Sequence, residues 1–265
     1  YSFFLNIFYI FTNMIFSQNS YRVLGVVSNS GVKEIKKNIS KLKAFSKIGK
    51  DVTFDYDLSF LNLAKLDRRE SSLLQSENSL NMDKNKITNS LFWFTDLSSV
   101  DSVALANLIK GDTDKSIEIF EKATKSNEVS SKNYSSFNNL STLLLLTSLD
   151  DSRTDIFKKD DTSIQRIKKA LQLKTLFLSS TFYNTYCEEI CKSVALDSAA
   201  AQDFFTTSIL DLLNKNFNTK EISSLFDGLD NHLKEKLSDT LTEAPLSNVK
   251  SHIESANELI KSDEK

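Results

Sequence analysis

The sequence predicts an all-α fold, and two observations carry that prediction. The 265-residue chain contains only 5 glycines and 1 proline. Hairpins, β-sandwiches and phosphate-binding loops use glycine at turns with positive φ, so this composition argues against an all-β fold, a P-loop enzyme and a Rossmann enzyme. Apolar residues also recur at spacings of three and four along the chain, which is the pattern of amphipathic helices.

Charge and cysteine content exclude several classes of function. The net charge is -2 and the pI is about 5.8, so a broad basic surface for nucleic acid is not expected. Cys187 and Cys191 have three residues between them, which differs from redox motifs, and we interpret them as small buried side chains on one helix face. His232 and His252 are expected at the surface. We predict no disulfide framework, no metal site and no cofactor, in a reduced cytoplasmic setting.

Residues 1–18 are predicted to be a non-native upstream or signal-like segment, and residues 1–13 are excluded from the fold prediction. The segment is rich in Phe, Ile, Tyr and Asn, and no Lys or Arg precedes Arg22. A signal peptide needs a basic start and a small-residue cleavage site, and a membrane span needs about 20 apolar residues. We predict non-native sequence upstream of a start at Met14, or a fragment end, with a degenerate signal or membrane anchor as the alternative. Membrane contact is expected only if residues 1–16 are native.

Residues 19–95 are predicted to form a compact helical unit. A short helix ends at Gly25, which suits a left-handed C-cap. A second helix runs from about residue 32 to 47 and ends before Gly49. Its apolar stripe consists of Ile35, Ile39, Leu42 and Phe45. A third helix starts near Asp67 and ends near Asn81, with Leu73, Leu74 and Leu80 on its apolar face, and a fourth segment covers residues 84–94.

This unit resembles the J-domain of the J-domain co-chaperone family. The resemblance is carried by Tyr21-Arg-Val-Leu-Gly-Val26, by Lys33-Glu-Ile-Lys-Lys37, and by Leu80 followed by Lys86. Ser76 stands where the family has an alanine. The resemblance implies structural roles for Tyr21, Leu24, Ile35, Leu42 and Leu80.

The unit departs from the family at one decisive place. Family members carry a His-Pro-Asp tripeptide after the second helix, whereas this chain has Gly49, Lys50 and Asp51 in that loop. In the family the tripeptide stimulates the ATPase of a heat-shock chaperone. The resemblance therefore implies a degenerate J-like unit that cannot deliver this stimulus in the usual way.

The lysine-rich second helix is the predicted partner-docking site. In the family, a basic second helix docks the heat-shock partner by charge. The candidates carried over to this chain are Lys33, Lys36, Lys37, Lys41 and Lys43. A solvated helix face is the alternative interpretation of such a charge run. RNA is not expected here, because no aromatic residues alternate with the lysines to stack bases.

Residues 96–175 are predicted to form helical repeats. The stretch from Ala104 to Ala123 resembles a tetratricopeptide (TPR) repeat: Gly111-Asp112 makes the turn between two antiparallel helices, Ser116 is small where they cross, and Phe120 fills the gap. An ordinary helical hairpin is the alternative. A degenerate second unit follows, with residues 139–146 as its first helix, a polar loop near 150–161, and a second helix that contains Ser163, Ile167 and Ala170.

Residues 176–265 show further apolar stripes at 176–196, 204–217, 222–229 and 233–241, and a last helix is predicted near 248–260. No catalytic pairing is visible in this region, and we predict no enzymatic activity.

The sequence as a whole predicts a J-domain-like helical unit followed by a TPR-like antiparallel helical array and a C-terminal helical region. The predicted function is a chaperone-associated adaptor for protein–protein interaction. Its partner would be a heat-shock ATPase or another protein, docked chiefly by Lys36, Lys37 and Lys41. The alternative is a structural helical-repeat scaffold with no chaperone link, tethered to a membrane if residues 1–16 are native.

Overall fold

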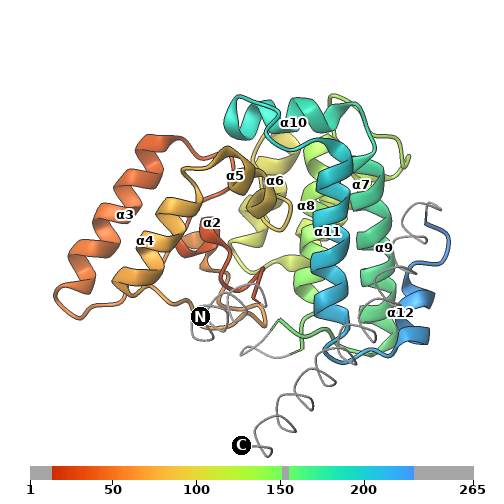
Figure 1. The fold of residues 1–265 in the computed structure, drawn as a ribbon, viewed down its shortest axis with the longest axis horizontal. Coiled ribbons are helices and arrows are strands. Elements are labelled where there is room, and N and C mark those ends of the chain that lie inside the picture. The colour runs from red at the N-terminus through yellow and green to blue at the C-terminus, as the bar shows by residue number, and fades with distance from the viewer. Residues whose placement is uncertain (1–13, 151–154, 230–265) are drawn as a thin grey trace, which may run out of the picture. The chain divides into compact units, whose positions relative to one another are not determined.

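The structure, a computed structural model, describes residues 14–150 and 155–229, and this part of the chain is all-α, as predicted (Figure 1). No strand occurs in these two ranges, where an isolated bridge pairs Leu149 with Phe157. The helices are α2 (Ser20–Val23), α3 (Val32–Ser46), the 3-10 helix η1 (Asp55–Asp57), α4 (Glu70–Ser79), α5 (Asp83–Ser90), α6 (Ser99–Leu108), α7 (Thr113–Thr124), α8 (Tyr134–Thr147), α9 (Asp161–Leu178), α10 (Phe182–Cys191), α11 (Ser198–Leu213) and α12 (Thr219–Leu225).

The chain divides into two compact units, with the boundary between Asn216 and Phe217. The domain boundaries expected after residues 95 and 175 both fall inside the first unit. In the second unit, α12 begins with a capping box, in which Asn218 and Glu221 each accept a hydrogen bond from the other's backbone N–H. The helices predicted at 233–241 and 248–260, and both histidines, lie outside the described residues.

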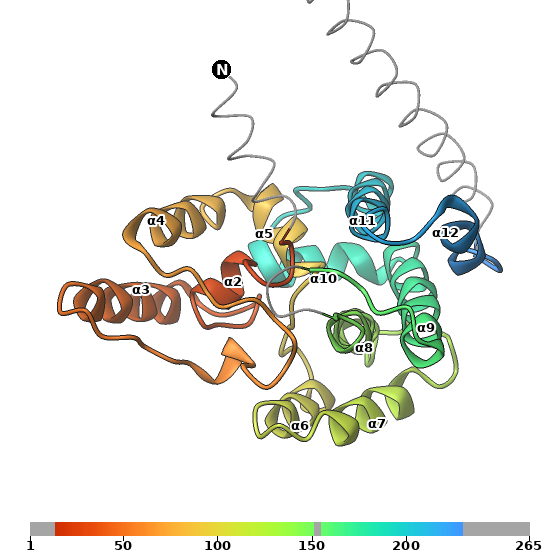
Figure 2. The same cartoon turned by 90° about the horizontal axis from the view of Figure 1, so that it is seen from below.

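Helix α8 is the central element of the first unit. It packs against α6, α7, α9 and α10, and Figure 2 shows it near the middle of these helices. The predicted burial of residues 143–146 is confirmed, and the burial extends along α8 from Tyr134 to Leu146. A helix that is enclosed in this way must also bury its polar positions, and Ser135, Asn138 and Asn139 are all inside.

Two antiparallel helix pairs are present where the repeats were predicted. In the α6–α7 pair, Ala104, Ser116 and Phe120 are fully buried at the helix contact. Asp112 accepts a hydrogen bond from the backbone N–H of Lys115 at 3.1 Å and so caps α7. In the α8–α9 pair, the buried positions on α9 include Ser163, Ile167 and Ala170, as the spacing predicted.

The N-terminal helices match their predicted ranges more closely than their predicted faces. Ile39 and Leu42 of α3 are buried, but Ile35 is half-buried and Phe45 is 37% exposed at the edge of the helix. Leu73 and Leu80 are buried, whereas Leu74 is 50% exposed, so its assignment to the apolar face of α4 is wrong. Leu73 and Leu74 are neighbours, and adjacent helix positions point about 100° apart.

Two boundaries were also misplaced. Helix α4 begins at Glu70, after the N-cap Arg69, and not at Asp67. The Asp67 carboxylate accepts hydrogen bonds from the Arg69 N–H and from the Ser72 hydroxyl in the first turn. The fourth segment is helical only as far as Ser90. The chain then continues without helical structure to Ser98, with Phe92, Trp93 and Phe94 fully buried.

Residues 14–18 belong to the folded unit, although they were grouped with the excluded N-terminal segment. Phe16 and Ser17 are fully buried. Their backbone N–H groups donate to the buried carboxylate of Asp155 at 2.8 and 3.2 Å. The folded unit therefore includes residues that precede Asn19.

Gly25 adopts φ +67°, which confirms the predicted left-handed C-cap of α2. A Cβ atom at this position would collide with the ring of Phe54. Both the backbone conformation and the close approach of Phe54 therefore require glycine.

Candidate functional site

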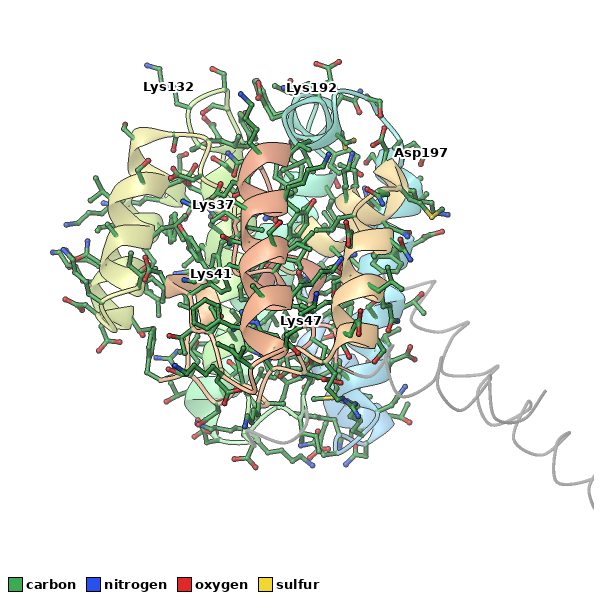
Figure 3. The ribbon with its side chains drawn as sticks, turned by 90° about the vertical axis from the view of Figure 1, so that its left-hand side faces the viewer. Lys37, Lys41, Lys47, Lys132, Lys192 and Asp197 are labelled. Atoms are coloured by element: carbon green, nitrogen blue, oxygen red, sulfur yellow. The ribbon has the colours of Figure 1, made fainter. Side chains whose placement is uncertain are left out.

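The predicted docking lysines lie on the solvent side of α3. Asn38, Ile39 and Leu42 face inward, and α3 packs beside α4 (Figures 1 and 2). Lys33, Lys36, Lys37, Lys41 and the C-cap Lys47 are exposed, while Lys43 is half-buried. Figure 3 shows Lys37, Lys41 and Lys47 spread along the outer side of the helix. We call the lysines of this side the basic face: Lys33, Lys36, Lys37, Lys41, Lys43 and Lys47.

Two lysines of the basic face have neighbours that hold them. Lys43 makes an ion pair with Glu77 of α4 at 3.1 Å, and the Lys41 ammonium lies 5.0 Å from the centre of the Phe54 ring. Lys33, Lys36, Lys37 and Lys47 make no ion pair with any residue in the described ranges. Glu34 is the one acidic residue of α3. The face therefore carries positive charge that the described part of the chain leaves largely unpaired.

The degenerate loop at the His-Pro-Asp position borders a cleft. Gly49, Lys50 and Asp51 are exposed, and Gly49 turns the chain at φ +66° after α3. The cleft has a volume of about 1040 Å³ and extends from the end of α3 to residues 57–69. Basic side chains outnumber acidic ones in its lining, which holds Arg22, Lys50, Lys65, Arg68 and Arg69 against Asp51, Asp57 and Asp67.

Arg68 is the centre of the charge network in the cleft wall. Its guanidinium makes two hydrogen bonds to the Asp57 carboxylate and donates further to the carbonyls of Val23, Val52 and Arg22. All five N–H donors are therefore used. Arg68 therefore ties the loop after α3 to α2. Its bidentate pair with Asp57 was not visible in the sequence, because the two residues lie eleven positions apart without a recognisable pattern.

Arg22 is a buried cation that is held by neutral oxygens. It is 3% exposed and donates to the carbonyls of Asp57, Ser17 and Ala64. Burial lowers the pKa of Arg22 to about 10. Since both buried arginines are satisfied inside the protein, the cleft wall offers neither of them as a free anion-binding group.

The inner face of the predicted repeats is occupied by the chain itself. Asn139 of α8 accepts from the Thr95 N–H at 2.9 Å and donates to the Thr95 carbonyl at 2.8 Å. Asn138 donates to the carbonyls of Ser90 and Trp93 at 3.2 Å. These amides hold residues 90–95 against α8 much as they would hold a bound peptide.

Lys174 of α9 completes the attachment of this segment. Its side chain is fully buried and donates to the Leu91 carbonyl and to the Asn138 amide oxygen. Its ammonium lies 5.4 Å from the centre of the Phe205 ring. Burial lowers the pKa of Lys174 well below its ordinary value, because the charged form is poorly solvated there. The burial of this amine and its two hydrogen bonds support a structural role.

Asp101 joins α6 to α8. Its carboxylate accepts hydrogen bonds from the Leu97 N–H and from the side chains of Ser98, Ser135, Ser136 and Asn139. Burial raises its pKa, although these donors stabilise the anion. This group was not visible in the sequence, because three of its donors lie on α8, more than thirty residues away.

The two cysteines differ in their burial. Cys187 is buried, as predicted, but Cys191 is only half-buried, which corrects the expectation for the pair. Burial raises the pKa of Cys187 to about 11, so its thiol is protonated near neutral pH. No cluster of His, Cys, Asp or Glu suited to a metal ion is present in residues 14–150 and 155–229.

Comparison with known proteins adds no identification. No family model matches the chain, and no curated protein or solved structure matches it. Within the described ranges, every helix is too short or too polar to cross a membrane. The resemblances to a J-domain and to TPR repeats therefore stay predictions from the sequence motifs.

Proposed function

We propose that the protein is a protein–protein interaction adaptor that docks an acidic partner surface on the basic face. The supporting observation is that Lys33, Lys36, Lys37 and Lys47 line the solvent side of α3 without ion pairs in the described residues. Unpaired charge of one sign on an exposed helix attracts a surface of opposite charge and speeds its association. The adaptor acts by binding and not by catalysis.

The J-like motifs indicate a heat-shock ATPase as the partner. The loop that would carry the His-Pro-Asp tripeptide contains Gly49, Lys50 and Asp51, so the protein is expected to bind the ATPase without stimulating it. In this proposal the lysines dock the ATPase, and the degenerate loop explains why the docked ATPase is not stimulated.

A binding experiment with a charge-matched control tests the proposal. The full-length protein is immobilised and incubated with the purified heat-shock ATPase. Binding to the wild-type protein is compared with binding to its triple variant Lys36→Glu, Lys37→Glu, Lys41→Glu. The control triple variant changes Lys84, Lys110 and Lys125 to Glu, which reverses the same amount of charge at exposed positions away from α3. We expect binding to the wild type and the control, and its loss in the α3 variant. Failure of the wild type to bind would overturn the chaperone link.

One observation favours a second candidate, a structural scaffold. TPR-type arrays hold partner segments in a concave groove, but here Asn138 and Asn139 of α8 hold residues 90–95 of the same chain. A partner peptide could reach this surface only by displacing Phe92, Trp93 and Phe94 from the core. If the repeat-like helices serve to support the fold, the scaffold predicts that the ATPase binds neither the wild type nor either triple variant.

A further inference from the structure

The cleft at the end of α3 is continuous with the basic face. Ser46, Gly49 and Lys50 line the cleft and flank Lys47, the last lysine of that face. A partner segment that lies along α3 would therefore reach the cleft without leaving the protein surface.

The cleft combines an apolar floor with a basic rim. Leu42 and Leu63 are buried beneath it, and the half-buried Val52 and Leu66 present apolar surface to it. Lys50 and Lys65 are exposed in its lining. Pockets of this size and composition bury apolar side chains and use a few polar groups for orientation.

Covering this cleft would leave Arg22 and Arg68 with their partners, and the one exposed carboxylate of the lining that makes no ion pair in the described residues is Asp51. The Arg68 donors are all satisfied by Asp57 and by backbone carbonyls, and Arg22 is held by carbonyls of the protein. An interface loses affinity when it buries unpaired charges, whereas a core that is already satisfied can be covered at little cost. The exposed Lys50 and Lys65 remain free to meet acidic groups.

We infer that the partner is an acidic segment that carries an apolar anchor, which it places in the cleft while its carboxylates lie on the basic face. This inference rests on the proposed function and adds the chemistry of the partner. It assigns the Gly49–Asp51 loop a role in binding, as one wall of the cleft that holds the apolar anchor. The occupant is a segment of another protein, and residues 1–13, which adjoin Met14 at the cleft, are the competing occupant.

Two synthetic peptides provide the test. Both are dye-labelled and carry the same number of glutamates, and they differ only in that two serines of one are leucines in the other. Their binding to the full-length protein is measured by fluorescence anisotropy. We expect the leucine peptide to bind at least about tenfold more tightly, which is the effect of burying one apolar side chain.

A variant of the cleft and a matched control locate the effect. Ser59 is exposed in the cleft lining, and Ser59→Trp would fill the cleft without touching the core. Ser126→Trp places the same ring at an exposed serine after α7. We expect Ser59→Trp to remove the preference for the leucine peptide and Ser126→Trp to retain it.

The outcomes separate this inference from the proposed function. If the wild type binds both peptides equally and the Lys36/Lys37/Lys41 variant loses both, the anchor site is wrong and the docking face stands. If neither peptide binds the wild type, the proposed docking face itself fails. If the full chain shows no preference but a chain starting at Met14 does, residues 1–13 occupy the cleft and the inference is overturned.

Discussion

Replacement of Lys174 by methionine should change how the stability of the protein depends on pH. The amine is fully buried, and its two hydrogen-bond acceptors are uncharged oxygens of Leu91 and Asn138. Its pKa is far below the ordinary value in the folded protein but returns to that value, 10.5, on unfolding. Between these two pKa values the unfolded chain binds the extra proton, so stability rises with pH.

The magnitude follows from proton linkage. One proton taken up on unfolding corresponds to about 1.4 kcal/mol of unfolding free energy per pH unit. At every pH where the folded amine is neutral and the unfolded amine is charged, the wild type should therefore gain stability with pH at up to this slope, a gain that Lys174→Met lacks. The slope is more diagnostic than the absolute difference, because methionine removes the titrating amine but also leaves two acceptors without a donor.

Urea unfolding can measure this slope, since the buried Trp93 is the single tryptophan and reports on the same core. Midpoints are recorded at intervals of pH for the wild type, for Lys174→Met and for Lys169→Met, a control at an exposed position of the same helix. The control should follow the wild type. Parallel pH profiles for the wild type and Lys174→Met would refute the reasoning, because they would mean that the buried amine keeps its proton in the folded state.

Three further substitutions test the packing argument. Gly25→Ala should lower the unfolding free energy by more than about 2 kcal/mol, because it combines a left-handed backbone with a collision at Phe54. Gly111 also has positive φ but open space around it, so Gly111→Ala should lower the unfolding free energy by about 1 kcal/mol. Equal losses for Gly25→Ala and Gly111→Ala in chemical denaturation would argue against the role of Phe54. Asp101→Ala should destabilise by about 3–5 kcal/mol, since it removes the common acceptor of donors on α6 and α8, and a loss under 1 kcal/mol in the same assay would count against that role.

The helices could be predicted from the sequence because their signals are local. The range of α3 and the Gly111-Asp112 turn between α6 and α7 depend on signals within one or two helical turns, and both were located correctly. Of the stripe predicted for α3, only Ile39 and Leu42 are buried. The apolar face predicted for α4 was wrong at Leu74, because local spacing does not distinguish Leu73 from Leu74. Only tertiary packing decides which of the two is buried.

The polar interior could not be predicted, because it joins residues that are far apart in the sequence. Lys174 reaches Leu91, 83 residues away, and Asn139 reaches Thr95, 44 residues away. A lysine in an amphipathic helix is ordinarily expected in solvent, and nothing local marks Lys174 as buried. The lysines of α3, by contrast, were located on the exposed side of their helix by periodicity alone, although periodicity says nothing of what they bind.

The salt dependence of binding tests the docking of an acidic partner on α3 most directly. The affinity of the heat-shock ATPase for the full-length protein is measured by titration calorimetry from 50 to 200 mM salt, for the wild type and for the Lys36/Lys37/Lys41 variant. Unpaired surface charges are screened over this range. The account predicts that the wild-type affinity falls several-fold with added salt while the variant binds weakly throughout. Equal affinities and equal salt dependence for the two proteins would contradict it.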